Sequence, residues 1–284
     1  MTTDATGQRI EQLSAQLENQ WRPASEVIQV KKRLIVAASA HPKTGKTTLA
    51  MGATEPIYIA NFDDGLEGVA DDAIAAGKQV YVTNYHMPEG ATPIIIQEAA
   101  LPVYAQFMAD ARSVLKGGQG TLVIDTHTEQ WEMCRFAYFG RIQQVMPYQY
   151  GPVNASMRAF IREMYSAGIS VILNRRLAKK YVDDNWNGEY EPRGYNGLEY
   201  ETQMNVKMGR VDPTHTDPGY FWMQVVDCRQ NSQLNGRIYF DQDIHFKQLI
   251  ADVFGEVETD GNRMFIPGGT SSTWQEAKQK AAGV

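Results

Sequence analysis

The sequence is poor in cysteine and has no long apolar run. Only two cysteines, Cys134 and Cys228, occur among 284 residues, far apart and without the spacing of a metal site. This predicts buried free thiols in a reducing compartment rather than a disulfide framework. No run approaches the roughly 18–20 apolar residues that span a bilayer, and the N-terminal residues lack the pattern of a signal peptide. We therefore expect a cytoplasmic protein without a membrane partner.

Positive charge is also in short supply. Lys and Arg number 27 against 33 Asp and Glu, so the net charge is -6. This argues against a protein coated by nucleic acid over its whole surface, but it leaves room for a local basic groove. Hydrophobic residues make up 43% of the chain and charged residues 21%, which is ordinary for a globular protein and disfavours disorder, collagen and coiled-coil rods.

The composition along the chain predicts three parts. Residues 1–30 form an amphipathic helix and a linker, because apolar residues recur there at three- and four-residue spacing. These apolar residues are Ile10, Leu13 and Leu17. The helix either packs on the protein's own core or docks on a neighbouring subunit. Residues 31–255 form the main domain, and 256–284 form a flexible tail with a short helix.

Short, charge-free apolar runs alternate with helix-like stretches in the main domain. Such runs are typical of strands buried on both faces, and the alternation predicts a mostly parallel sheet flanked by crossover helices, an α/β fold. The predicted strands are 34–38, 56–60, 79–82, 121–124 and 169–173, and the longer helices are 95–116, 128–145 and 152–167. The runs 202–210, 220–228 and 237–240 lack long helices between them, so we predict antiparallel strands added at the C-terminal edge.

The segment 40–48 carries the pattern of a phosphate-binding P-loop. It reads Ala-His-Pro-Lys-Thr-Gly-Lys-Thr-Thr between a buried strand and a helix, the context of G-x-x-x-x-G-K-[ST], although Ala40 stands where a glycine is usual. Gly45 allows a tight turn, Lys46 would reach the β- and γ-phosphates, and Thr47 would hold Mg²⁺. The predicted nucleotide contacts are Pro42, Lys43, Thr44, Gly45, Lys46, Thr47 and Thr48.

Polar residues end three of the predicted strands. Asp125 would position Mg²⁺, cap the following helix, or do both. Asp63, with Asp64 as the alternative, follows a strand that we expect beside the P-loop strand, where a carboxylate would deprotonate the attacking water; the bland interpretation is an acidic turn. Asn174 either senses the γ-phosphate or belongs to a turn. The predicted catalytic residues are Lys46, Asp63 and Asp125.

A basic segment follows Asn174 in this acidic chain. We predict a loop in which four cations and one aromatic ring grip single-stranded DNA, with a solvated charge run as the alternative. The residues are Arg175, Arg176, Lys179, Lys180 and Tyr181. Arg210 and Arg229 lie further along the chain, and either could reach the phosphates of a neighbouring subunit as an arginine finger.

In this order the motifs resemble the RecA-like P-loop ATPases, and most of all the phage-encoded ATP-binding proteins of single-strand annealing and recombination. The resemblance spans roughly residues 31–254 and rests on 42–48, 61–65, 124–129, 157–158, 171–174, 190–194 and 227–229. It implies ATP-dependent binding or annealing of single-stranded DNA by a homo-oligomer, a ring or filament, in the cytoplasm of a bacterial host. It assigns the triphosphate and Mg²⁺ to Lys46 and Thr47, makes Asp125 the metal-positioning acid, and turns the loop after Asn174 toward DNA. RecA relatives carry a longer Glu where Asp63 stands, so water activation is expected to be weaker or differently arranged.

Three functions stay open at this point. The first is a DNA-recombination ATPase that assembles on single strands. The second is an ATP-gated assembly or loading factor whose target is another replication or recombination protein, such as a helicase; the acidic balance and the N-terminal helix favour it. The third is a nucleotide-binding structural protein with little turnover, which Ala40 and Asp63 allow.

Overall fold

The structure is a computed structural model that describes residues 9, 12, 33–63, 65–66, 68–142, 146–183, 185–215 and 218–255. The chain divides into two compact units, Met1–Lys31 and Lys32–Val284. Arg9 and Gln12 of the first unit are helical and exposed. The rest of the predicted N-terminal helix, the tail 256–284 and the alternative base Asp64 lie outside the described residues.

The second unit is built on a mixed sheet that has nine strands among the described residues. The strands are β1 (Ile35–Ala40), β2 (Ile57–Asn61), β3 (Val80–Asn84), β4 (Thr121–Asp125), β5 (Ser170–Val182), β6 (Asn185–Pro192), β7 (Met204–Val211), β8 (Tyr220–Cys228) and β9 (Ile238–Phe240). Their order is β3-β2-β4-β5-β1-β7-β8-β9, and β6 pairs with β5. The first six strands of that order are parallel, whereas β8 pairs antiparallel with β7 and β9 pairs antiparallel with β8. The predicted fold class is confirmed.

One expected strand direction is wrong. The run 202–210 was expected among the antiparallel strands, yet β7 pairs with β1 in parallel. The hairpin of β5 and β6 explains the difference, because β6 runs antiparallel to β5 and reverses the chain before the short helix α8 (Leu198–Glu201). The chain thereby returns to the edge of the sheet where β1 begins.

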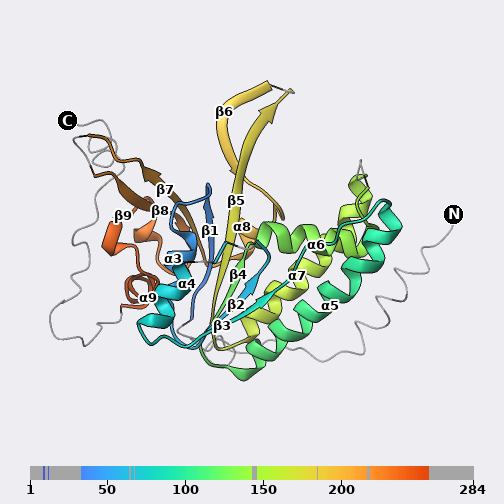
Figure 1. Cartoon of the computed structure of the whole chain (residues 1–284), viewed down its shortest axis with the longest axis horizontal. Helices are drawn as coiled ribbons and strands as arrows, with labels where there is room; N and C mark the ends of the chain where they lie inside the picture. The colour runs from blue at the N-terminus through green and yellow to red at the C-terminus, as the bar shows by residue number, and fades with distance from the viewer. Residues whose placement is uncertain are drawn as a thin grey trace. The chain divides into compact units, whose positions relative to one another are not determined.

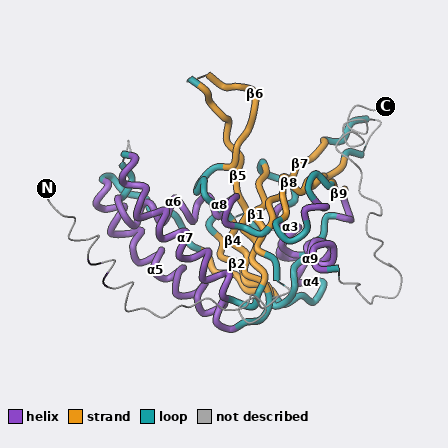
Figure 2. Tube along the Cα trace, turned by 180° about the vertical axis from the view of Figure 1, so that it is seen from behind, coloured by secondary structure: helices purple, strands orange, loops and turns teal. Residues whose placement is uncertain are grey.

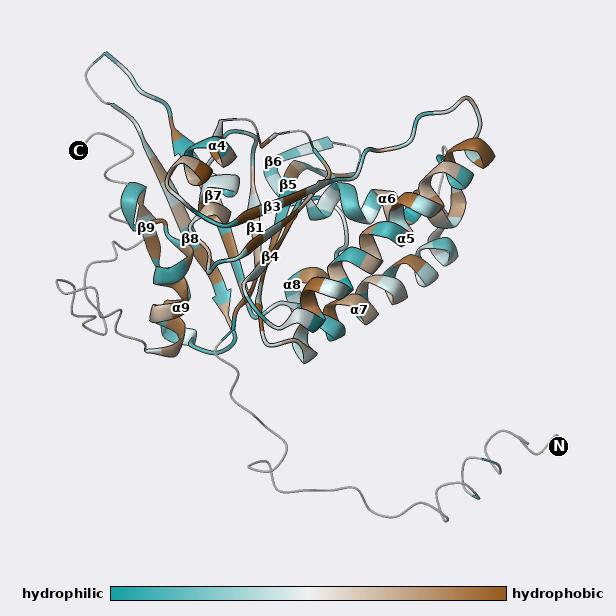
Figure 3. Cartoon of the chain, turned by 60° about the horizontal axis from the view of Figure 1, so that its bottom comes forward, coloured by the Kyte–Doolittle hydropathy of each residue, from teal (hydrophilic) through white to brown (hydrophobic). Residues whose placement is uncertain are grey.

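Helices cover both faces of the sheet (Figures 1 and 2). One layer holds α5 (Pro93–Gly117), α6 (His127–Phe139) and α7 (Tyr150–Ser166), and the other holds α3 (Lys46–Met51), α4 (Val69–Ala75) and α9 (Phe246–Phe254). Short 3₁₀ turns lie at Pro147–Gln149, Ser232–Leu234 and Asp241–Asp243. Successive residues of β1 enter different cores, since Ile35 packs with the first helix layer and Val36 with the second. The central strands are accordingly hydrophobic along most of their length (Figure 3).

Helix α6 ends earlier than its sequence pattern predicts. The predicted helix 128–145 stops at Phe139, because Gly140 has φ 66 and breaks the helical path. A side chain is not tolerated at this turn, since a Cβ atom on Gly140 would lie 1.9 Å from the carbonyl oxygen of Pro93.

The predicted basic loop is wrong, because residues 175–181 belong to strand β5. Together with β6 this strand extends beyond the sheet as a hairpin (Figure 1). The hairpin is mostly hydrophilic (Figure 3). Along β5 the side chains change from buried at Asn174 to exposed at Tyr181. The basic segment is therefore an ordered arm that begins in the sheet.

Both cysteines are free and buried, as the sequence predicts. Burial raises the pKa of Cys134 to about 11 and also raises the pKa of Cys228. Among the described residues, no helix has both the length and the apolar character needed to cross a membrane.

The two thiols are expected to resist modification in the folded protein. The thiolate is the reactive form, and raising a thiol pKa from 9 to about 11 leaves roughly one hundredth of the thiolate at pH 8. Labelling with a thiol-specific chromogenic disulfide should be slow in buffer and should reach two thiols per chain in urea. Fast labelling of two thiols in the native protein would contradict the burial of Cys134 and Cys228.

Candidate nucleotide-binding and active site

The candidate site lies at the carboxyl edge of the parallel strands. In the strand register Asn61 lies opposite Asp125, Asp125 opposite Asn174, and Asn174 opposite Ala38. The sheet thus aligns the carboxyl ends of β2, β4 and β1 with Asn174 inside β5, at the edge where open α/β sheets bind ligands. The expected neighbour of the P-loop strand is wrong, because β4 and β5 separate β2 from β1.

The P-loop connects β1 to α3 and is closed by its own hydrogen bonds. Gly45 has φ 88, the left-handed conformation that glycine adopts most readily. Thr44 Oγ1 donates to the carbonyl oxygen of His41 at 2.7 Å. Ala40 is fully buried at the end of β1 and is not among the residues with positive φ. The unusual alanine is therefore compatible with the loop.

Lys46 lies inside this loop. Its Nζ donates to the carbonyl oxygens of His41 at 2.9 Å and Ala40 at 3.4 Å. Burial lowers the pKa of Lys46, while the nearby carboxylates of Asp125 and Asp63 oppose the effect. Pro42, Lys43 and Thr48 are exposed around it. A buried ammonium in a loop of this pattern suits the phosphates of a nucleotide.

Thr47 and Asp125 form the other half of the site. Thr47 Oγ1 donates to Asp125 Oδ2 at 2.9 Å. Burial and then the charge of Asp63 raise the pKa of Asp125, and the neighbouring polar side chains and Lys46 oppose the rise. The cap of α6 is Thr126, whose Oγ1 accepts from the amide of Glu129 at 3.3 Å. The Asp125 carboxylate is not needed for capping, and with the Thr47 hydroxyl it offers the oxygen ligands that Mg²⁺ prefers.

Asp63 is ion-paired in the structure. Arg176 Nη2 lies 3.0 Å from Asp63 Oδ2, and Arg176 Nη1 lies 2.6 Å from Glu129 Oε1. Glu129 was missed as a site residue, although its place three residues after the helix cap Thr126 was visible as a capping-box spacing. Arg176, predicted to contact DNA, thus belongs to the candidate active site.

Several buried polar groups behind this edge have no hydrogen-bond partner within the described part of the chain. They include both amide atoms of Asn174, both ring nitrogens of His127 and Gln130 Oε1. Burial, followed by the charge of Arg175, lowers the pKa of His127 to about 3, so the imidazole is neutral near pH 7. The amide of Asn174 lies beside the Asp125 carboxylate, and since buried polar groups are normally paired, it suits a contact with phosphate or with the attacking water.

The remaining predicted DNA contacts divide between the core and the hairpin. Arg175 is only 1% exposed and donates to the carbonyl oxygens of Pro192 at 3.4 Å and Tyr195 at 3.3 Å, so its predicted DNA contact is wrong. Lys179 Nζ lies 4.8 Å from the centre of the Trp186 ring. The other two predicted DNA contacts lie on the surface of the hairpin. Lys180 pairs with Glu189 at 2.9 Å, and Tyr181 is 59% exposed.

The two candidate arginine fingers lie far apart. Arg210 pairs with Asp212 near the carboxyl end of β7. Arg229 follows β8, whose end pairs with the start of β7, and its side chain donates to the carbonyl oxygen of Tyr200. Arg229 therefore lies at the opposite edge of the sheet from the P-loop.

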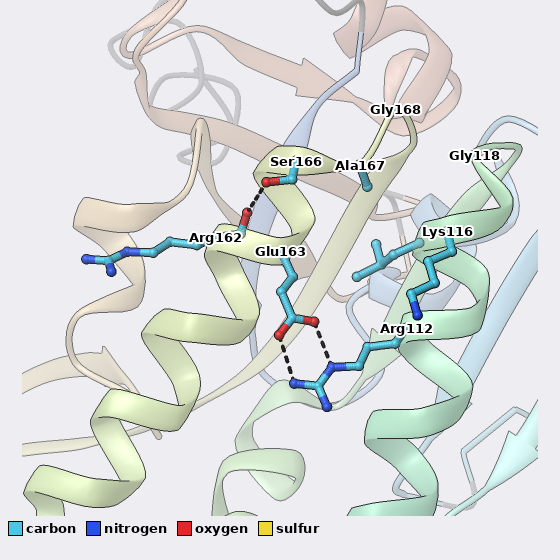
Figure 4. Close-up of a pocket in the computed structure, with 9 residues that line it drawn as sticks. Arg112, Lys116, Gly118, Arg162, Glu163, Ser166, Ala167 and Gly168 are labelled. Atoms are coloured by element: carbon cyan, nitrogen blue, oxygen red, sulfur yellow. Dashed lines mark hydrogen bonds and ion pairs between the residues drawn. The ribbon is translucent and has the colours of Figure 1, made fainter. Parts of the chain in front are cut away.

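A separate open groove lies between the last turns of α5 and α7 (Figure 4). Its volume is about 720 Å³, and a bidentate pair of Arg112 with Glu163, at 2.8 Å for each bond, crosses it. Since β4 and β5 begin just after these helices, the groove lies at the amino edge of the sheet. It is distinct from the candidate nucleotide site.

The fold and the site together define a P-loop nucleotide-binding domain of the α/β class. Residues 32–213 match the model of a family described as the AAA domain, which covers more than half of the chain. The chain belongs to this AAA domain family, and ATP binding and hydrolysis are the general activities of such domains. Comparison with curated proteins found no match.

Proposed function

We propose that this protein is an Mg²⁺-dependent ATPase that binds single-stranded DNA through the β5–β6 hairpin when ATP is bound. The proposal includes assembly into a homo-oligomer on the DNA and a role in recombination or replication. It is carried by one observation: β5 passes without interruption from the candidate active site into the hairpin.

The site residues suggest how hydrolysis would proceed. Lys46 and the loop amides would hold the phosphates, and Thr47 and Asp125 would hold Mg²⁺, which neutralises charge on the β- and γ-phosphates when bound. Asp63 would accept a proton from the attacking water. Asn174 would contact the γ-phosphate or that water.

The hairpin also contacts the P-loop directly. The rings of His41 and Tyr190 meet edge to face with centroids 4.4 Å apart. His41 belongs to the P-loop and Tyr190 to β6, so a movement of the loop on phosphate binding would be passed to the hairpin through this contact. This contact, together with the continuity of β5, gives the nucleotide two mechanical connections to the hairpin.

Aromatic rings make the hairpin suitable for unpaired bases. Tyr181, Trp186 and Tyr190 are 59%, 47% and 39% exposed. Exposed rings stack on bases with little sequence preference, and a nearby cation such as Lys179 attracts the backbone phosphates.

A protein target is the second candidate, and the charge of the hairpin favours it. Residues 177–192 contain two lysines but four acidic residues. An acidic surface repels the phosphate backbone of DNA, whereas exposed aromatic residues are common in protein interfaces. In this alternative the hairpin would load or remodel another replication or recombination protein in an ATP-dependent way.

A DNA titration distinguishes the two functions. A fluorescent oligothymidine should bind more tightly with a nonhydrolysable ATP analogue than with ADP. Replacing Trp186 by alanine should weaken binding about tenfold, because stacking of one base contributes about 1–3 kcal/mol. The measurement is fluorescence anisotropy at fixed salt.

Tyr148→Ala is the matched control, since Tyr148 is 76% exposed but lies outside the hairpin. Its DNA affinity should equal that of the wild type. Absence of DNA binding with every nucleotide, while ATP hydrolysis persists, would eliminate the DNA function and favour the protein target. If the target is a protein, replacing Lys179 and Lys180 by acidic residues should leave activity in a replication or annealing assay unchanged.

A further inference from the structure

One arginine of the predicted DNA segment lies beside the P-loop. Arg176 is opposite Ala40, the first residue of the loop pattern, in the register of β5 with β1. Its guanidinium contacts Asp63 after β2 and Glu129 in α6. Burial lowers the pKa of Lys46, and the charge of Arg176 acts in the same direction. These contacts place the guanidinium where β2, α6 and the P-loop converge.

The charges around this guanidinium favour an exchange of partners. Asp63, Asp125 and Glu129 provide three carboxylates, whereas Lys46 and Arg176 provide two cations. A triphosphate that enters this edge adds further negative charge, which the cations must offset. The planar guanidinium binds phosphate oxygens in a bidentate manner as well as it binds carboxylates. A γ-phosphate at this edge would therefore compete with Asp63 and Glu129 for Arg176.

We propose that Arg176 is a catalytic residue that acts within its own chain. When ATP is bound, its guanidinium breaks its ion pairs with Asp63 and Glu129 and contacts the γ-phosphate instead. This inference rests on the ATPase function proposed above and names a residue of that site. It reassigns Arg176 from the DNA-binding set to the active site.

The exchange would serve hydrolysis in two ways. As the water oxygen bonds to the γ-phosphorus, the bond to the β–γ bridging oxygen breaks, and Arg176 stabilises the charge on the γ-phosphate oxygens. Departure of the guanidinium also frees Asp63 Oδ2, which takes the proton of the water. The products are ADP and inorganic phosphate.

The structure favours Arg176 over the two arginines singled out from the sequence. Arg210 is paired with Asp212, and Arg229 lies at the amino edge of the sheet. Each would need a neighbouring subunit to reach a γ-phosphate. Arg176 is already held beside the loop by residues of its own chain.

Substitution of Arg176 tests the proposal through turnover and nucleotide preference. Arg176→Ala should lower kcat about 10³-fold, the scale at which such arginines act. It should weaken ATP binding about tenfold, as expected for a lost charged hydrogen bond, while ADP binding stays unchanged. Arg176→Lys should recover only part of kcat because an ammonium lacks the planar fork. The measurements are phosphate release at saturating ATP and calorimetric affinities for an ATP analogue and ADP.

Arg112→Ala is the matched control. It removes an arginine of similar exposure, 47% against 38% for the Arg176 side chain, that also pairs with a carboxylate of another element (Figure 4). Turnover and nucleotide preference should stay at wild-type values. Thermal unfolding verifies that each variant folds, and Arg176→Gln replaces the alanine variant if that variant does not.

The outcomes separate the inference from the proposed function. Turnover of Arg176→Ala within about threefold of the wild type, with the preference for ATP retained, would overturn the inference and leave the ATPase function intact. Wild-type turnover no higher than that of Lys46→Ala would instead remove the ATPase function. In that case the calorimetric affinities test the inference. If Arg176→Ala no longer binds the ATP analogue more tightly than ADP, relative to the wild type, the phosphate contact is supported; if the difference in affinity is retained, the inference is overturned.

Discussion

Replacement of Lys46 by alanine is expected to lower ATP turnover about 10²- to 10³-fold, the usual effect of removing one preorganised hydrogen-bond donor from an active site. The Lys46 ammonium lies inside the P-loop on the carbonyl oxygens of His41 and Ala40. Alanine leaves these carbonyls facing the phosphates without a cation, so ATP affinity should fall as well. Phosphate release with saturating ATP and Mg²⁺ measures the first effect, and calorimetry measures the second.

Lys116→Ala is the matched control for this variant. Lys116 is exposed in the last turn of α5 and lines the groove at the amino edge of the sheet (Figure 4). Its loss should leave turnover and ATP affinity unchanged. Phosphate release at background rates in both the wild type and Lys46→Ala would select the third function considered from the sequence, a nucleotide-binding structural protein.

Replacement of Asp63 by asparagine should reduce kcat about 10²- to 10⁴-fold, the range of general base catalysis, while ATP binding is retained. Asparagine keeps the size of the side chain and can still accept a hydrogen bond from Arg176, but it cannot take a proton from water. Removal of a negative charge beside the phosphates should not weaken nucleotide binding. A lower kcat together with an unchanged dissociation constant for ATP is therefore the result that identifies Asp63 as the base.

Asp72→Asn, at an exposed acid of α4, controls for loss of surface charge and should leave kcat unchanged. Near-normal turnover of Asp63→Asn would contradict the role of Asp63 as the base. Glu129 would then be the next acid to test, because it holds the other side of the same guanidinium. A loss of turnover in Glu129→Gln alone would move the proton acceptor from β2 to α6.

Arg175 and Arg176, at the base of the hairpin, have different surroundings although they are adjacent in the sequence. The sequence Arg175-Arg176 offers two adjacent cations with the same apparent role. Because they lie on a strand, their side chains point to opposite faces. Arg175 becomes fully buried among carbonyl oxygens, and Arg176 reaches Asp63 and Glu129. The sequence analysis predicted a loop here. Side chains in a loop do not alternate between two faces, so the different positions of the two arginines were not predicted.

The sequence by itself determined the P-loop, the pairing of Thr47 with Asp125 at the expected edge, and the parallel α/β class. The P-loop and the fold class depend on short-range properties: apolar runs that form buried strands, a glycine at a left-handed turn, and residue types within one contiguous motif. Thr47 and Asp125 are 78 positions apart, but their meeting was predictable because the carboxyl ends of parallel strands lie at one edge of the sheet. Tertiary structure decided the strand neighbours of β2, the direction of β7 and the partners of Arg176. Asp63 and Arg176 are separated by 113 positions, and they meet because β2 and β5 pair with the two sides of β4. Strand order depends on how all the helices and strands pack together, and no single segment of the chain encodes it.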